Sequence, residues 1–297
     1  MSNYLSLHPS YFLKEGFGTL MSHYAVMYSL YKDVNITPVV VNIDFQSRHQ
    51  ISAMKFFNNF NQPIIDHHQA FKNFKDIFLL LNEQEVSKYN WSTQNWGHMQ
   101  YDDIVNHLKK QTQNISCIWS LSSHMYDKYL NEIINMLYVF NDSIIESAKN
   151  ILPKTDKNII AICVRNEYKK INCPHVKLSL NFYIESMKQF DTNNSQYLIF
   201  SDDIEESKTI FKPLEQSFDI VYTDLIQSAI GMCAMSMCDH IICANSSFSY
   251  WASLLNTKPS KKIVCSTKFI DPQINSQLAE SLNYKWYPDN WYAIDIC

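Results

Sequence analysis

The chain has 297 residues, of which 46% are hydrophobic and 18% are charged, and its formal net charge is −4. This composition excludes a disordered protein and allows one large domain or two of ordinary size. A nucleic-acid-binding protein is also excluded, because the sequence contains no basic stripe with interleaved aromatic residues.

Targeting and redox signals are sparse. The N-terminal stretch MSNYLSLHPSYFLKEG lacks the basic start and apolar centre of a signal peptide. No run of about 18 apolar residues occurs, so the sequence predicts no membrane span. The eight cysteines form no C-x-x-C pair, which argues against a zinc ribbon. We therefore expect a cytoplasmic protein with reduced thiols.

The first half of the chain has weak periodicity, so its elements are predicted from short patterns. In chain order they are a helix over 18–32, a buried strand (VVVNI) after Pro38, several short helices within 55–110, a strand over 115–121 and one long helix over 125–150. The segment 151–158 reads as a linker, because Pro153 cannot continue the preceding helix and polar residues follow it.

Beyond this linker, strands and helices alternate regularly. The predicted strands are 159–165, 196–203, 218–224, 240–245 and 261–266, and the predicted helices are 178–190, 204–211, 226–238 and 249–256. This spacing is typical of a parallel sheet of Rossmann type. We expect two Rossmann-like halves, residues 1–153 and 154–297, with a single larger sheet as the alternative.

Polar residues stand where these strands end. They are Arg165, Asp202, Asp203, Asp224 and Asn245. Ligands of parallel α/β sheets bind beyond the carboxyl ends of the strands. The second half is therefore expected to hold a ligand at this edge.

One segment of the second half resembles a known family. CANSSFSYWASLL at 243–255 resembles the signature IANSSFSWWGAWL of family 11 glycosyltransferases, the α-1,2-fucosyltransferase family. Weaker matches follow the family's order: EGFGTLMSHYAVMYSL (15–30), IWSLSSHMYDKYLNEI (118–133), LIFSDDIEESK (198–208) and YPDNWYAID (287–295). The family's H-x-R-R-x-D motif is altered to Cys163-Val164-Arg165-Asn166-Glu167-Tyr168, and its N-terminal Asn-Gln pair is Thr19-Leu20.

The resemblance implies an α/β, GT-B-like fold, with two Rossmann-like domains facing across a cleft. The C-terminal domain would bind the nucleotide sugar and the N-terminal domain the acceptor. The implied reaction is transfer of L-fucose from GDP-fucose to a glycan hydroxyl, α-1,2 to a galactose-like residue, with inversion and without metal or cofactor. The altered motif leaves open another nucleotide sugar, such as a rhamnose donor, or a non-catalytic descendant that binds glycan or nucleotide.

Donor-binding roles follow from side-chain chemistry. The planar fork of Arg165 suits a diphosphate and would stabilise charge on the leaving group, with a surface ion pair as the alternative. One of Asp202 and Asp203 would accept hydrogen bonds from base or ribose, while the other caps the next helix. Asn245, Ser246 and Ser247 stand at a helix N-terminus that suits phosphate or ribose, with plain capping by one serine as the alternative. Asp224 is a further donor-site candidate.

The remaining candidates are glycines, acids and histidines. By resemblance, Gly16 and Gly18 would face the cleft and let the backbone approach the substrate, with a plain turn as the alternative. Glu167 is the expected general base because it matches the acid of the family motif. His23 and His175 are weaker candidates for the base or for acceptor binding.

Two kinds of chemistry are not expected. Asp202 and Asp203 have no third ligand at useful spacing, so no metal site is predicted. Cys163 lies in an apolar strand and is not expected to act as a nucleophile.

Overall fold

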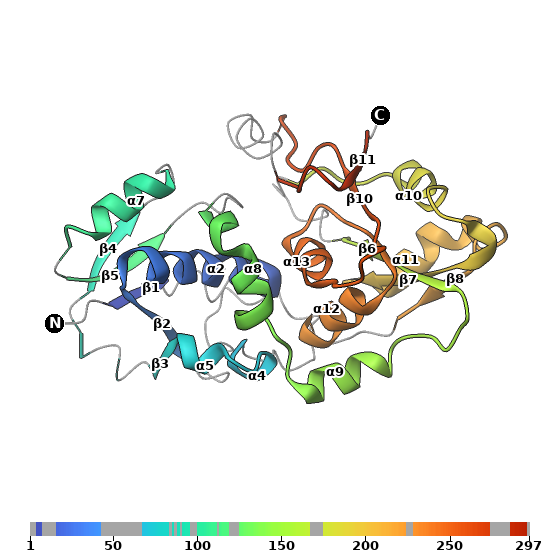
Figure 1. Ribbon diagram of the computed structural model, residues 1–297. Coiled ribbons are helices and arrows are strands. Elements are labelled where there is room, and N and C mark those ends of the chain that lie inside the picture. Colours follow the sequence, from blue (N-terminus) through green and yellow to red (C-terminus); the bar gives the residue numbers. More distant parts are fainter. Residues whose placement is uncertain are drawn as a thin grey trace. The chain divides into compact units, whose positions relative to one another are not determined.

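The computed structural model describes residues 4–7, 16–42, 67–82, 85, 88–89, 91–95, 100–111, 113–118, 125–166, 175–223, 228–273 and 286–295. The chain divides into two compact units, residues 1–141 and 142–297, each with its own sheet (Figure 1). The two sheets exclude the alternative of one larger sheet. The boundary lies before helix α9 (Asp142–Lys149) rather than at the expected 153/154.

The N-terminal unit is built on a five-stranded parallel sheet with the order β3-β2-β1-β5-β4. Its strands are β1 (Tyr4–Leu7), β2 (Thr37–Asn42), β3 (Leu79–Asn82), β4 (Trp91–Asn95) and β5 (Asn114–Ile118). Its helices are α2 (Phe17–Val34), α4 (His67–Ala70), α5 (Phe74–Ile77), α7 (Tyr101–Leu108), η3 (Asp127–Tyr129), α8 (Leu130–Glu132) and the π-helical turn η4 (Ile133–Leu137). The short helices expected within 55–110 are present as α4, α5 and α7, but the prediction missed β3 and β4.

Helix α2 is the central helix of this unit and contacts β1, β2 and α7. Nearly every residue from Phe17 to Leu30 is buried, as expected for a helix that is apolar on most sides. Tyr24 packs edge-on against Phe74 and Phe78, with ring centroids 5.2 and 5.5 Å away. Asn35 ends the helix in the left-handed conformation (φ 53°), which asparagine tolerates, and the chain then enters β2.

The long helix predicted over 125–150 is wrong, because the helix is interrupted at residues 138–141. Phe140 forms an antiparallel bridge with Phe71. On either side, the Lys72 amide donates to Val139 O (2.8 Å) and the Asn141 amide donates to Ala70 O (2.9 Å). These long-range backbone hydrogen bonds replace the helical ones, and α9 starts again at Asp142 in the other unit.

The C-terminal unit contains a six-stranded parallel sheet with the order β11-β10-β9-β6-β7-β8. Its strands are β6 (Asn158–Val164), β7 (Ser195–Ser201), β8 (Ile220–Tyr222), β9 (His240–Ile242), β10 (Ile263–Ser266) and β11 (Tyr292–Ile294). Its helices are α9, α10 (Leu180–Met187), η6 (Thr192–Asn194), α11 (Ile204–Phe211), η7 (Lys212–Leu214), α12 (Ser228–Met237) and α13 (Ser247–Leu255). Every strand and helix predicted between 159 and 266 is confirmed to within a few residues, whereas β11 was not predicted.

The order of these strands places a switch point in the sheet. The chain enters at β6, adds β7 and β8 on one side, and then crosses to β9 on the other side. Connections therefore leave β6 and β9 in opposite directions, which opens a crevice at their carboxyl ends.

The core of this unit is fully apolar in its centre. Ile160, Ile162 and Trp251 are each 0% exposed. The described cysteines 163, 233, 238, 243 and 265 are all buried free thiols, in agreement with the expected reduced state. Among the helices that the structure describes, none combines the length and apolarity needed to cross a bilayer.

Candidate functional site

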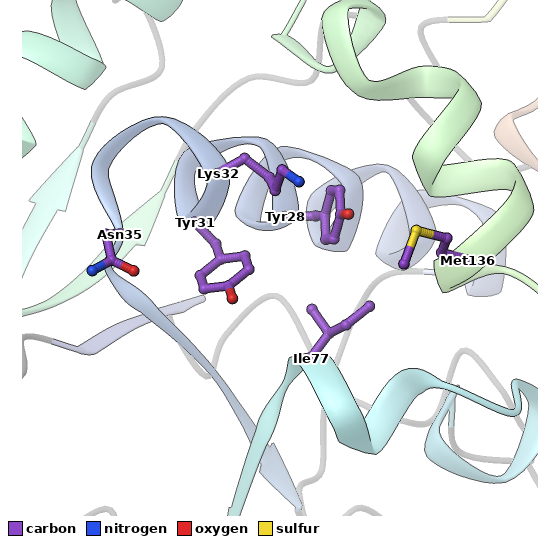
Figure 2. A pocket seen from close by; sticks show the side chains of 6 residues that line it. All are labelled: Tyr28, Tyr31, Lys32, Asn35, Ile77 and Met136. Atoms are coloured by element: carbon purple, nitrogen blue, oxygen red, sulfur yellow. The ribbon is translucent and has the colours of Figure 1, made fainter.

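A pocket of about 470 Å³ opens on the N-terminal unit (Figure 2). It is lined by Tyr28, Tyr31, Lys32, Asn35, Ile77 and Met136. Three of them belong to the C-terminal half of α2, Asn35 follows that helix just before β2, and Ile77 and Met136 come from α5 and η4. The pocket therefore lies at the amino edge of its sheet, opposite to the edge where parallel sheets bind ligands. We do not assign it to the functional site.

The functional candidates of the C-terminal unit gather at the carboxyl edge of its sheet. Arg165 follows β6, Asp202 follows β7, and residues 245–247 follow β9. Arg165 and residues 245–247 flank the switch point between β6 and β9, and Asp202 lies beside Arg165 at the end of β7. Glu167 and Asp224 lie outside the described residues, so the structure does not test them.

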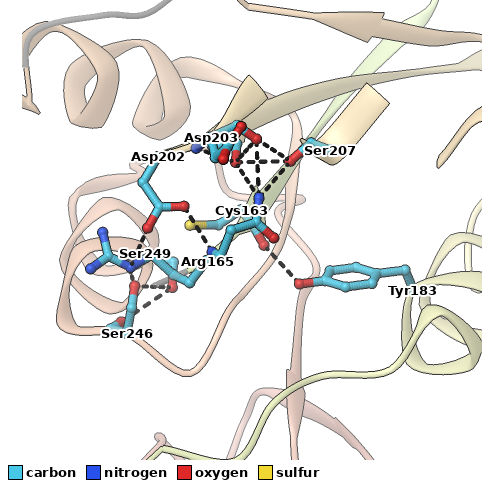
Figure 3. Close-up of polar contacts among 10 residues, drawn as sticks. Cys163, Arg165, Tyr183, Asp202, Asp203, Ser207, Ser246 and Ser249 are labelled. Atoms are coloured by element: carbon cyan, nitrogen blue, oxygen red, sulfur yellow. Dashed lines mark hydrogen bonds and ion pairs between the residues drawn. The ribbon is translucent and has the colours of Figure 1, made fainter. Parts of the chain in front are cut away.

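Arg165 and Asp202 form an ion pair at this edge (Figure 3). Arg165 Nε lies 3.6 Å from Asp202 Oδ2, and the Asp202 side chain is only 7% exposed. Asp202 Oδ1 accepts a hydrogen bond from the Asn166 amide at 2.8 Å. An ion pair was the alternative interpretation of Arg165, but its partner is a buried carboxylate in the candidate site. The pair involves Nε, so it does not use the terminal guanidinium nitrogens that bind phosphate.

Asp203 performs the capping role that was expected of one of the two acids. Its carboxylate accepts from the Glu206 amide at 3.0 Å and so begins helix α11. Because Asp203 caps the helix, Asp202 is the acid of the pair that remains for ligand binding.

Asn245 is a structural tether rather than an exposed ligand group. Its side chain is 1% exposed, and its amide donates to Val176 O and Lys268 O, both at 2.9 Å. Its Oδ1 accepts from the Tyr287 hydroxyl at 3.2 Å. The amide hydrogens are thus used within the protein, and Asn245 joins three separate segments beneath the site.

The two serines at the start of α13 have different positions: Ser246 caps the helix, and Ser247 is its first residue. Ser246 is the N-cap residue, and its hydroxyl accepts from the Ser249 amide at 3.3 Å. Ser249 in turn donates to Ala244 O at 2.9 Å, which holds the turn closed. Plain capping is therefore confirmed for Ser246, while Ser247 occupies the first helical position, where backbone amides face outward.

Sequence reasoning missed two contributors to this edge. Asn166 was noted only as a lost arginine, yet its side chain contacts Ser201, Asp203 and Ser207. Tyr287, whose hydroxyl reaches Ala244 O and Asn245, lies in the YPDNWYAID segment that already resembled the family. That resemblance was the available signal for Tyr287, whereas Asn166 had none.

Cys163 is excluded as a nucleophile by its surroundings. It is 3% exposed, and burial raises the pKa of its thiol to about 11. The thiol is therefore protonated at neutral pH, as expected for an inert packing cysteine.

The two histidines occupy packing positions. His23 is 1% exposed within α2, and burial lowers its pKa to about 3, so it stays neutral. His175 forms an antiparallel bridge with Ile270, and its ring packs edge-on against Phe269 at 4.8 Å. These contacts account for both imidazoles as packing groups, so we do not carry them into the proposal.

Gly16 and Gly18 begin helix α2. Gly16 is the N-cap residue with φ −75° and ψ 164°, a conformation open to any residue. A Cβ added there would meet nothing within 4 Å. Gly18 is buried in the first turn. The folded chain itself does not require glycine at position 16, so the open space in front of it is available to a ligand.

In the part of the chain that the structure describes, no three His, Cys, Asp or Glu side chains gather in the manner of a metal site. The chemistry available at the β6/β9 edge is therefore that of one arginine, one buried carboxylate and a helix N-terminus.

Comparisons with known proteins agree with this architecture. POFUT1 in complex with GDP-fucose superposes with a TM-score of 0.53 at 13% identity, over 88% of this chain and 97% of that one. The fucosyltransferase NodZ from Bradyrhizobium gives 0.51 at 13% identity, over 86% and 94%. At these identities the likeness concerns the fold alone, and it confirms the predicted α/β, GT-B-like class.

Sequence comparison identifies the family. The O-antigen biosynthesis glycosyltransferase WbnK of Escherichia coli is 24% identical over 190 residues, which is 59% of this chain. The match spans 62% of WbnK, less than two thirds of its length. The model of glycosyl transferase family 11 matches residues 19–294. The match covers nearly the whole chain, and the protein therefore belongs to glycosyl transferase family 11.

Proposed function

We propose that this protein is an inverting, metal-independent glycosyltransferase that transfers L-fucose from GDP-fucose to a glycan hydroxyl. The linkage we propose is α-1,2 to a galactose-like residue, as the resemblance to the family implies. The observation that carries the proposal is the Arg165–Asp202 pair at the carboxyl ends of β6 and β7, next to the switch point between β6 and β9.

Arg165 is the proposed diphosphate ligand. Arg48 and Arg165 are the only arginines of the chain, and Arg165 stands at the edge of the sheet where ligands bind. With Nε facing Asp202, its terminal nitrogens would form two parallel hydrogen bonds to phosphate oxygens. The same contacts would stabilise the charge that develops on the leaving GDP, which is the role a metal ion plays in other transferases.

Asp202 and helix α13 would complete the donor site. Asp202 Oδ2 is buried, and no hydrogen-bond donor of the described residues reaches it. A buried oxygen in this state is suited to accept an N–H or O–H group from the base or ribose. The amides at the start of α13, around Ser247, would add favourable dipole interactions with the phosphates.

Glu167 is the proposed general base for the acceptor hydroxyl. It follows Arg165 by two positions in the chain and matches the acid of the family motif. Gly16, with open space in front of its Cα, is proposed to let the backbone approach the substrate.

Another nucleotide sugar is the second candidate donor, because the neutral Asn166 stands where the family pattern has a second arginine. Its amide is bound to Ser201 and Ser207, so it adds no cation to the site.

Calorimetric titration with GDP, UDP, dTDP and GDP-fucose tests the donor. We expect selective binding of GDP and GDP-fucose that is strongly weakened, but still measurable, in Arg165→Ala. Lys188→Ala is the matched control, since it removes a cation from an exposed ion pair with Glu185 in the same unit. Selective binding of UDP or dTDP would show that the donor is a nucleotide sugar other than GDP-fucose. Absence of all binding to the folded protein would favour the non-catalytic descendant.

Mass spectrometry of galactose-terminated acceptors incubated with GDP-fucose tests the reaction. We expect one deoxyhexose to be added and then removed by a linkage-specific α-1,2-fucosidase. Transfer that resists this enzyme would keep the fucosyltransferase and reject the α-1,2 linkage.

A further inference from the structure

The residue next to Arg165 is tied into a polar cluster. The side-chain amide of Asn166 donates toward Asp203 O (3.0 Å), Ser207 Oγ (3.1 Å) and Ser201 Oγ (3.2 Å). An amide has two hydrogens, so these three acceptors fully occupy it. We call Asn166, Ser201, Ser207 and the Asp203 carbonyl the asparagine–serine cluster.

The asparagine–serine cluster joins three elements of the C-terminal unit. Ser207 Oγ lies 2.8 Å from Ser201 Oγ and 3.0 Å from Asp203 O, and it is 0% exposed. Ser201 Oγ also accepts from the Asp203 amide at 3.0 Å. The cluster thus links the end of β6 to the end of β7 and the first turns of α11 (Figure 3). Ser207 is buried and the other members are partly exposed, and the several hydrogen bonds together favour one geometry of the cluster.

The main chain of Asn166 connects the asparagine–serine cluster to the proposed donor site. Its amide nitrogen donates to Asp202 Oδ1 at 2.8 Å, while Asp202 Oδ2 faces Arg165 Nε at 3.6 Å. Asn166 therefore holds the loop with its side chain and the buried carboxylate with its backbone. The Asn166 amide therefore couples the end of β6, which carries Arg165, to Asp202 at the end of β7.

We propose that Asn166 is a positioning residue that sets the Arg165–Asp202 pair for diphosphate binding. This inference rests on the proposed function. The side-chain amide of Asn166 is occupied by hydrogen bonds within the protein, so Asn166 does not contact the nucleotide sugar itself. It acts through Arg165. Asn166 is therefore a brace, by which we mean a side chain whose hydrogen bonds hold the end of β6 in place. An arginine at position 166 would lose these hydrogen bonds and would disturb the site rather than improve it.

Binding of GDP, measured by calorimetry, tests the inference in a double-mutant cycle. We expect Asn166→Ala to weaken GDP binding about tenfold. The double variant with Arg165→Ala should bind no more than about twofold more weakly than Arg165→Ala alone, because residues that act through one another are not additive. Ser207→Ala removes the member of the cluster that lies in α11, and it should weaken GDP binding about threefold. This variant tests the inference if Asn166→Ala fails to fold.

The matched control is Asn256→Ala. Asn256 is likewise a buried tether, with its amide donating to Cys238 O at 2.8 Å, but it lies at the amino edge of β9. We expect it to lower stability and leave GDP affinity unchanged. Asn166→Arg compares two interpretations of this position, a positioning residue and the site of a lost phosphate ligand. For a positioning residue we expect the arginine to weaken GDP binding.

Several results would overturn the inference alone: wild-type affinity in both Asn166→Ala and Ser207→Ala, additive effects in the cycle, tighter binding by Asn166→Arg, or an equal loss in Asn256→Ala. In each case the wild type would still bind GDP and Arg165→Ala would still bind it more weakly. If the folded wild type binds no nucleotide, the proposed function fails and the inference fails with it.

Discussion

The two units each contain an acid in a polar network, but at opposite edges of their sheets. In the C-terminal unit, Asp202 lies at the carboxyl edge beside Arg165. In the N-terminal unit, Asp33 lies at the end of α2, where the chain turns into the amino edge of β2. Asp33 accepts from Tyr101 (2.9 Å), Lys128 (2.5 Å) and Tyr129 (2.6 Å).

The two acids also differ in how completely they are satisfied. Burial alone would raise the pKa of Asp33, but the hydrogen bonds from Lys128, Tyr129 and Tyr101 outweigh it and lower the pKa. Asp202 Oδ2, in contrast, receives no hydrogen bond from the described residues. A satisfied network stabilises a fold, while an incomplete one at the ligand-binding edge is prepared for a ligand. A polar network is therefore a candidate ligand site when it lies at the ligand-binding edge of the sheet and contains an oxygen that receives no hydrogen bond. Polarity by itself does not make this distinction.

Arg165→Ala should give the largest effect on activity. Removing the diphosphate ligand should lower kcat/KM about 100- to 1000-fold, as for other groups that stabilise a developing anion. Lys128→Ala, which removes the cation beside Asp33 in the other unit, is the control and should leave kcat/KM of the folded enzyme unchanged. Equal losses in both variants would abolish the distinction between the two networks.

Asp33→Ala should affect stability instead of activity. It leaves the hydroxyls of Tyr101 and Tyr129 without their acceptor, which we expect to cost about 2–3 kcal/mol of unfolding free energy in urea titrations. Asp103→Ala, at an exposed position of α7, should change stability little. A large fall in kcat/KM of folded Asp33→Ala would show that the N-terminal network has a functional role.

His23 should make the protein sensitive to acid. Its pKa is about 3 when folded, against 6.5 for the free side chain, so the unfolded chain takes up the proton first. Its contribution to stability is therefore complete above pH 6.5 and is lost as the pH falls toward 3. The loss should reach about 2 kcal/mol between pH 6.5 and 5. Thermal unfolding of His23→Leu should show a shallower pH dependence than wild type; an unchanged slope in His23→Leu would contradict this.

Gly16→Ala should give the smallest effect. Its backbone angles suit alanine and no atom blocks the new methyl group, so stability should change by less than about 1 kcal/mol. If a substrate approaches the backbone there, kcat/KM should fall about tenfold. Full activity would reduce Gly16 to a plain turn residue.

Much of the C-terminal unit could be predicted from the sequence, because buried strands and the helices between them leave a local periodic pattern. The position of Arg165 and Asp202 at the carboxyl edge followed from the rule that ligand residues stand at strand ends, whereas their ion pair was visible only in the structure. The N-terminal unit was less predictable, since its strands β3 and β4 have only four and five residues and lie among aromatic, weakly periodic segments. The helix expected over 125–150 failed for a related reason, because Phe71 pairs with Phe140 from far along the chain.

The sequence by itself determined the family, the α/β class and the identity of the arginine and the acid at the ligand-binding edge. Local periodicity and strand-end position carry that information, because each depends on neighbours in the chain. The tertiary structure alone decided which polar groups remain available. Asn245 donates to residues 69 and 23 positions away, and Asn166 reaches Ser207 across 41 positions. Hydrogen-bond partners at such separations are chosen by the packing of the sheet, and they make Asn245 a tether and Asn166 a brace.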